Sequence, residues 1–167
     1  YVNKTNFYAF NGLINNDNKL SFLYGPKKSG KSFLSYIWLK NNDAIKFNNN
    51  LEYLLNNKRN LLIDDFFLFD EEIVFHVVNN AILNNNKLLI TSDVKINEIK
   101  FKFNDLSSRL KTFSSFQINQ PDDEMLITIL TKLLIEKQFI INKNDIFEFI
   151  LRRVNRSYQG IHDIVNK

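Results

Sequence analysis

Short apolar runs alternate with amphipathic stretches over the first two thirds of the chain. The runs at 20–24, 44–47, 61–63, 87–91 and 113–118 predict strands, because each is short and bounded by polar or turn-forming residues. Apolar residues at helical spacing predict helices at 7–14, 32–40, 51–55, 70–83 and 105–110. Strands that alternate with helices along a chain are typical of an α/β fold, in which a parallel sheet is covered on both faces.

Three of these helices, at 7–14, 32–40 and 70–83, have an apolar face, and the helix at 105–110 begins with a capping residue. We expect the first two to bury the following side chains: Phe7, Tyr8, Phe10, Leu13 and Ile14 in the first, and Phe33, Leu34, Ile37 and Trp38 in the second. Asp105 is a favourable N-cap residue, so it should open the helix that ends at Leu110.

The pattern changes at Pro121. From there the sequence predicts helices only: one that begins with Pro and acidic residues, a second at 145–154 and a third at 158–165. We therefore predict two domains, an α/β domain at 1–120 and a small helical lid at 121–167, joined without a flexible linker.

Composition narrows the functional classes. The chain of 167 residues has no cysteine, which excludes disulfides and thiolate metal sites and favours a reducing compartment, so we expect a cytoplasmic protein. No apolar run is long enough to span a membrane. The formal net charge of +4 permits contact with nucleic acid or acidic proteins but does not require it.

The segment between the first predicted strand and the helix after it carries a phosphate-binding pattern. Gly25, Gly30, Lys31 and Ser32 fit G-x-x-x-x-G-K-[ST], in which backbone N–H groups surround phosphates, the lysine reaches the β- and γ-phosphates and the hydroxyl ligates Mg²⁺. The start of the following helix adds its positive dipole end at the same point. The pattern predicts a site for ATP or ADP with Mg²⁺.

Acidic residues follow two later strands. Asp64 ends an apolar strand, where a carboxylate of a phosphate-loop protein holds Mg²⁺, and we assign it as a metal ligand with Ser32. Asp65 is predicted to orient the attacking water, the alternative being a solvated second acid. Asp93 is predicted to lie beside the γ-phosphate, the alternative being a strand-end cap.

Three further residues are candidates for a functional role. Arg109 is a candidate arginine finger for a neighbour's nucleotide, and the alternative is a local pair with Asp105, four residues earlier. His76 and His162 have no partner at metal-ligand spacing, and we expect both to be structural.

With GPKKSGKS, LLIDD, LLITSD and DLSSRL in this order, the sequence resembles the AAA+ ATPases of the DnaA family, and most closely their shorter Hda-type regulators. The resemblance places Walker A on 25–32, Walker B on Asp64 and Asp65, sensor 1 on Asp93, and the box VII finger on Arg109. It implies a five-stranded parallel sheet of order 5-1-4-3-2 with a helical lid, and an assembly in which one subunit's arginine meets the next subunit's nucleotide. The expected nucleotide contacts are Gly25, Pro26, Lys27, Lys28, Ser29, Gly30, Lys31, Ser32, Phe33 and Gln159.

Two departures from the family pattern matter. The position of the lid's sensor 2 arginine is held by Gln159, a neutral amide, with Arg156 one turn earlier as a substitute. DnaA continues into a helix-turn-helix domain, whereas this sequence ends at Lys167, so we expect no sequence-specific DNA binding. The 48–61 segment also leaves little room for the extra helix with which initiators grip single-stranded DNA.

The resemblance implies an ATP- or ADP-binding regulator that docks on DnaA and promotes ATP hydrolysis there, with weak hydrolysis of its own. It also implies the sliding clamp as a partner, through an N-terminal motif that the sequence does not show, and a homo-oligomer. The alternative is an adaptor or loader whose nucleotide is structural, which Gln159 favours. A phosphate-loop kinase is disfavoured because no domain for a second substrate is inserted.

Overall fold

The computed structural model describes residues 1–15, 17–50, 58–138, 150 and 152–165. Its strands are β1 (Leu20–Tyr24), β2 (Ile45–Lys46), β3 (Leu61–Ile63), β4 (Leu88–Ser92) and β5 (Ser114–Gln117). Its helices are α1 (Phe7–Ile14), α2 (Lys31–Asn41), α4 (Glu71–Leu83), α5 (Asn104–Leu110), α6 (Asp123–Glu136) and α8 (Tyr158–Val165), with the short 3-10 helices η1 (Phe66–Leu68) and η2 (Ile96–Glu98). The strands and helices predicted within the described part of 1–120 are confirmed, each within one residue of its predicted ends.

The five strands form one sheet of order β2-β3-β4-β1-β5, and every pair is parallel. This is the predicted order 5-1-4-3-2 in the opposite direction. Tyr24 of β1 lies opposite Ser92 of β4 and Gln117 of β5, so the carboxyl ends of these strands meet at one edge of the sheet. In such a sheet the segments that follow the strands share this edge, which is where open α/β sheets bind ligands.

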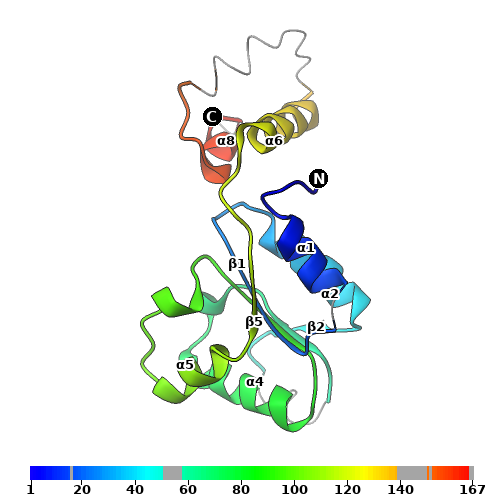
Figure 1. Ribbon diagram of the computed structural model, residues 1–167, viewed down its shortest axis with the longest axis vertical. Helices are drawn as coiled ribbons and strands as arrows, with labels where there is room; N and C mark the ends of the chain where they lie inside the picture. The colour runs from blue at the N-terminus through cyan, green and yellow to red at the C-terminus, as the bar shows by residue number, and fades with distance from the viewer. Residues whose placement is uncertain (16, 51–57, 139–149, 151, 166–167) are drawn as a thin grey trace.

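Alternate residues of the central strands pack against the two helical layers. Leu88 and Ile90 of β4 are in the cluster formed with α4 and α5, whereas Leu89 is in the cluster formed with α1 and α2. Phe22 and Leu23 of β1 divide between the two faces in the same way. Figure 1 shows α1 and α2 on one side of the sheet, with α4 and α5 on the other.

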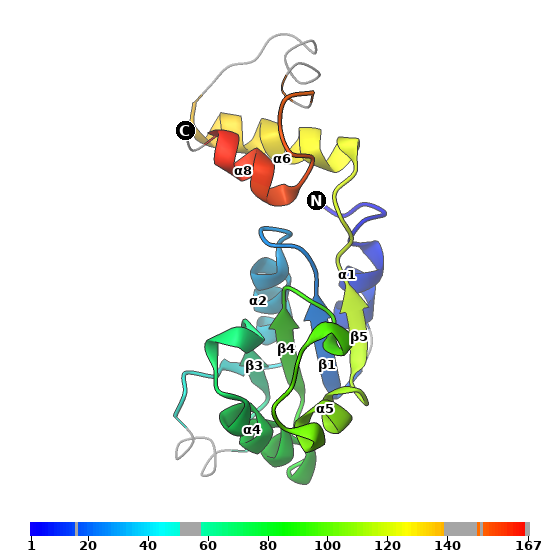
Figure 2. The ribbon, with the colours of Figure 1, turned by 90° about the vertical axis from the view of Figure 1, so that its left-hand side faces the viewer.

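Helices α6 and α8 form a separate layer beyond the carboxyl ends of the strands (Figure 2). Leu126, Leu130 and Ile161 give this helical pair a small core of its own. Tyr158 ties it to the sheet domain, since its hydroxyl donates to the Asn119 carbonyl at 3.3 Å and its ring joins the α1–α2 cluster. The lid is thus positioned over the strand ends, while the division at residue 120 stays a prediction.

Several details differ from the prediction. Phe33 is 70% exposed, and Phe7 and Tyr8 are also exposed, because the apolar stretch of each helix is wider than the face that meets the sheet. Asp105 is not the cap of α5, which begins at Asn104 after Phe103. The predicted helix at 51–55 lies outside the described residues, as do residues 145–149 and 151 of the helix predicted at 145–154. Of the rest, residue 150 is helical, whereas 152–154 form a turn and a bend, so the predicted helix does not extend to 154. In the described part of the chain, no helix has the length and apolar character needed to cross a membrane.

Candidate nucleotide-binding site

The loop between β1 and α2 has the backbone shape that the glycine pattern predicts. Gly30 is the N-cap of α2 with φ 92°, a left-handed conformation that side chains with a Cβ rarely adopt. A Cβ on Gly25 would lie 2.7 Å from the Ile118 carbonyl oxygen, so only glycine allows the loop to pass this close to the chain after β5. Helix α2 therefore begins at Lys31 with its free N–H groups facing the loop.

Lys31 is the most buried charge of the loop. Its ammonium donates to the carbonyls of Gly25 and Pro26, each at 2.8 Å, and pairs with Asp93 Oδ1 at 2.8 Å. Its side chain is 11% exposed. Three oxygens therefore engage the three N–H donors of this ammonium, so a phosphate oxygen would have to replace one of them to gain a charge-assisted bond.

Asp64 lies at the centre of a polar cluster after β3. Its Oδ1 accepts from Ser32 Oγ and Thr91 Oγ1, each at 3.2 Å, and its Oδ2 pairs with Lys46 Nζ at 2.8 Å. The predicted metal ligands Ser32 and Asp64 are thus in contact. A hydroxyl beside a carboxylate fits Mg²⁺, which is usually held by one or two protein oxygens together with substrate phosphates and water.

Lys46 was not among the predicted site residues. It is the last residue of β2, which pairs in parallel with β3, so its side chain reaches the carboxylate that follows β3. The Asp64 side chain is 17% exposed and that of Lys46 57%. The sequence signal was a lysine within the strand predicted at 44–47, the strand before the one that Asp64 follows, although the sequence alone did not establish that the two strands are neighbours.

Asp65 is held by local interactions. Its backbone has φ 75° and ψ 100°, its N–H donates to Thr91 Oγ1 at 2.8 Å, and its Oδ1 accepts from Phe67 N at 3.1 Å. Positive φ at a non-glycine residue costs about 1–3 kcal/mol, which these bonds help to offset. One carboxylate oxygen therefore caps η1, and the residue also lines the cavity described below.

Asp93 lies beside the loop, and its place next to a γ-phosphate stays a prediction. Besides its contact with Lys31, it lies 3.9 Å from Lys27 Nζ. The carboxylate thus faces the two lysines of the loop rather than the backbone of its own strand end.

Arg109 lies away from these residues. It is exposed on α5 and does not line the cavity, and its guanidinium carbon lies 5.5 Å from the centre of the Phe75 ring. Among the described residues it forms no ion pair with Asp105, so the local pair is not present. Helix α5, which carries Arg109, precedes β5 and lies at the opposite end of the sheet from the loop (Figure 2). Arg109 therefore cannot reach this chain's own loop.

The lid contributes neutral and titratable groups. Gln159 lines the cavity, and its amide donates to Asp163 Oδ1 at 2.6 Å. Arg156 pairs instead with Asp123 at 2.7 Å, on the exposed surface between α8 and α6, and does not line either cavity. His162, expected to be structural, lines both cavities.

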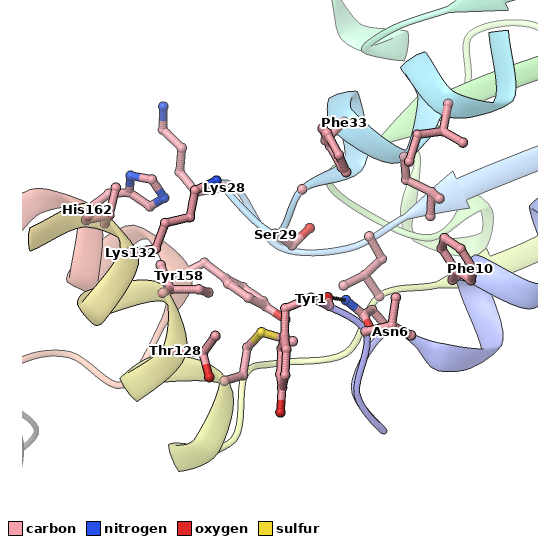
Figure 3. Close-up of a pocket in the computed structure, with 18 residues that line it drawn as sticks. Tyr1, Asn6, Phe10, Lys28, Ser29, Phe33, Thr128, Lys132, Tyr158 and His162 are labelled. Atoms are coloured by element: carbon pink, nitrogen blue, oxygen red, sulfur yellow. Dashed lines mark hydrogen bonds between the residues drawn. The ribbon is translucent and has the colours of Figure 1, made fainter. Parts of the chain in front are cut away.

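Two adjoining cavities separate the sheet domain from the lid. The polar one, of about 600 Å³, is lined by Lys31, Ser32, Asp64, Asp65, Asp93, Gln159 and other residues of the loop and lid. The apolar one, of about 330 Å³, lies between the N-terminal segment, α2, α6 and α8 (Figure 3). Lys28, Gly30, Phe33 and His162 line both. The Ser29 hydroxyl is buried at the wall of the apolar cavity, without a hydrogen-bond partner in the described structure.

The strand order, the glycine loop between β1 and α2, the carboxylates after β3 and β4, and the helical layer over the strand ends together define the fold of AAA+ P-loop NTPases. Solved structures of the replication initiator DnaA share this fold. The AMPPCP-bound DnaA from Aquifex aeolicus is 17% identical with a TM-score of 0.73, and the match covers 99% of this chain and 62% of that one. Domain III of Thermotoga maritima DnaA is 20% identical with a TM-score of 0.74, and the match covers 99% of this chain and 83% of that one.

The fold also extends to a protein described as a branch migration motor. The Thermotoga maritima RuvB Holliday junction branch migration motor is 14% identical with a TM-score of 0.62, covering 89% of this chain and 53% of that one. No protein-family model matches the sequence, and no curated protein matches it. This chain spans about three fifths of the Aquifex DnaA chain, and at these identities the likeness establishes the fold.

Proposed function

We propose that this chain binds ATP or ADP with Mg²⁺ at the edge of the sheet, beneath the lid. The observation that carries the proposal is that Lys31, Ser32 and Asp64 line one polar cavity at the start of α2, next to a loop whose shape requires glycine. Lys31 would donate to the β- and γ-phosphates, and Ser32 with Asp64 would hold the metal. Bound Mg²⁺ would neutralise part of the phosphate charge.

The apolar cavity would take the nucleoside. It adjoins the loop at Lys28 and Gly30, so a nucleotide with phosphates at the loop would extend its base and sugar between α2 and the lid. The unpartnered hydroxyl of Ser29 supports a polar ligand there, because a buried polar atom without a partner costs about 1–3 kcal/mol. The AMPPCP-bound DnaA of the same fold is consistent with this assignment.

We propose that the nucleotide-bound protein acts in the cytoplasm as an Hda-like regulator. It would dock on DnaA and promote hydrolysis of the ATP that DnaA carries. Arg109 supports this direction because it is exposed and remote from the chain's own cavity. A guanidinium in that position is available to a neighbour's nucleotide, where arginine fingers raise rates by about 10³ to 10⁵. Asp65 and Asp93 would serve hydrolysis of the chain's own nucleotide, which we expect to be weak.

A second candidate is an adaptor whose nucleotide is structural. Gln159 favours it, since the lid presents a neutral amide, already bonded to Asp163, at the polar cavity. The two candidates share the nucleotide site and differ in whether Arg109 acts on a partner.

The test has two stages. The first identifies nucleotide that co-purifies with the protein and measures ADP and ATP binding by calorimetry. The second mixes the protein with ATP-bound DnaA and measures phosphate release for wild type, Arg109→Ala and Lys111→Ala. Lys111 is also exposed and is the C-cap residue of α5, so it controls for loss of one positive charge at the same place.

Under the regulator proposal, wild type and Lys111→Ala should stimulate ATP hydrolysis by DnaA, and Arg109→Ala should not. The nucleotide affinity of all three proteins should be the same. Nucleotide binding without any stimulation of DnaA by the wild type would favour the adaptor. Absence of nucleotide binding would refute both.

A further inference from the structure

His162 stands where the two cavities meet. It is half-buried on α8, one turn after Gln159, and it lines both the polar and the apolar cavity. Figure 3 shows it near Lys28 of the loop, with Phe33 farther along the cavity. No hydrogen bond or ion pair joins it to Ser32 or Asp64 in the described structure. Its side chain therefore faces the proposed nucleotide site from the lid.

The charges around His162 come from three elements. Lys28 belongs to the loop, Lys132 and Glu136 to α6, and Asp163 to α8. The charged residues elsewhere on the wall of the polar cavity are Lys27, Lys31, Asp64, Asp65 and Asp93. Burial and the positive charge of Lys28 lower the pKa of His162 below its usual 6.5, and the carboxylates of Asp163 and Glu136 oppose this only in part. Near neutral pH the imidazole is therefore uncharged.

A polyphosphate bound at the loop would change this balance. Phosphate oxygens between Lys28 and His162 would partly compensate the lysine charge and stabilise an imidazolium, because an opposite charge at close range favours the charged form. Gln159 is neutral and Arg156 is engaged with Asp123, so His162 is the group lining the polar cavity from α8 that can become positive.

We propose that His162 contacts the phosphates of the bound nucleotide and takes up one proton as the nucleotide binds, so that the lid gains a positive charge only when the site is filled. The inference rests on the nucleotide-binding function proposed above. The proton comes from solvent and stays on the imidazole, and no covalent bond forms. Because the imidazolium forms with the complex, it would also draw the lid toward the phosphates.

The sign of the pH dependence follows from proton uptake. The complex holds more protons than the free protein, so affinity rises as pH falls through the interval between the free and bound pKa values of His162. Each pH unit by which nucleotide raises that pKa gives about a tenfold difference in dissociation constant across the interval. The terminal phosphate also titrates in this range, so the effect of His162 is the difference between wild type and a variant without it.

The chain has only two histidines, which makes NMR a direct test. The ring signals of His162 and His76 are titrated from about pH 5.5 to about pH 8 with and without saturating ADP, without added Mg²⁺. His76 is exposed on α4 and lines neither cavity, so it is the internal control. His162→Gln assigns the signals and, with His76→Gln as its matched control, gives ADP dissociation constants at both ends of the range.

The expected result is that ADP raises the pKa of His162 by about one pH unit or more and leaves His76 unchanged. From the high to the low end of the pH range, the ADP dissociation constants of wild type and His76→Gln should then fall about tenfold more than that of His162→Gln. If His162→Gln does not fold, the wild-type titration still decides. ADP binding with an unchanged or lowered His162 pKa overturns the inference and leaves the nucleotide proposal intact, whereas no ADP binding at any pH overturns both.

Discussion

Replacing Lys46 with methionine should strengthen Mg²⁺ binding at Asp64. Lys46 Nζ lies 2.8 Å from Asp64 Oδ2, so a metal at this carboxylate must share it with a resident ammonium. Methionine keeps an unbranched side chain and removes the charge. Because Lys46 is 57% exposed, solvent screens the pair, and its strength should be about 0.2–1 kcal/mol. The Mg²⁺ concentration for half-maximal effect should then fall by up to about fivefold.

The assay is a Mg²⁺ titration of the affinity for a fluorescent ADP analogue. Lys100→Met is the matched control, because Lys100 is exposed on the segment before α5 and lines neither cavity. Without Mg²⁺, loss of the pair should lower Tm by no more than about 2–4 °C. An unchanged or raised Mg²⁺ requirement in Lys46→Met, relative to Lys100→Met, would refute the idea that Lys46 competes with the metal.

Two further predictions concern the loop and the lid. Lys31→Ala should abolish measurable ADP and ATP binding in calorimetry, because each charge-assisted bond lost is worth about 1.5–3 kcal/mol; unchanged affinity would remove the loop from the site. Asp122→Ala should destabilise the protein by about 0.5–2 kcal/mol at pH 7, because Asp122 Oδ1 accepts from Met125 N at 2.9 Å as the N-cap of α6. That bond lowers the pKa of Asp122 below 3.8, so its contribution is present above this value and is lost as pH falls below it. The difference between thermal melts of wild type and variant should therefore shrink as pH falls below 3.8; a constant difference would contradict this account.

Lys46 and Asp64 show the limit of inference from local pattern. Lys46 lies within the run at 44–47 and Asp64 directly follows the run at 61–63, and each run was predicted as a strand from its own composition. That the two runs are parallel neighbours is a property of the sheet, and only this pairing brings the ammonium to the carboxylate. The same reason applies to His162, which is separated by more than 130 positions from the loop it faces.

Arg109 illustrates a choice between two interpretations that the sequence left open. Spacing of four residues allowed a pair with Asp105, but the guanidinium lies over Phe75 of α4 instead. Helical spacing indicates which side chains of one helix can be near each other. The packing of α4 against α5 decides which contact forms. Phe33 is similar: its place in an apolar stretch predicted burial, yet it is exposed at the cavity.

The sequence by itself determined the elements and the phosphate loop. Burial on one or both faces of an element leaves a period in the sequence, and the loop depends on glycines and a lysine at fixed spacing, so both are local properties. The tertiary structure decided what surrounds the loop: Lys46 on Asp64, Asp93 on Lys31, and the lid's histidine between the two cavities. These contacts join segments far apart in the chain. The free energies of these contacts depend on the distance between the groups and on their burial. Sheet order and lid position determine both, and the hydrophobic period of a single helix or strand contains no record of either.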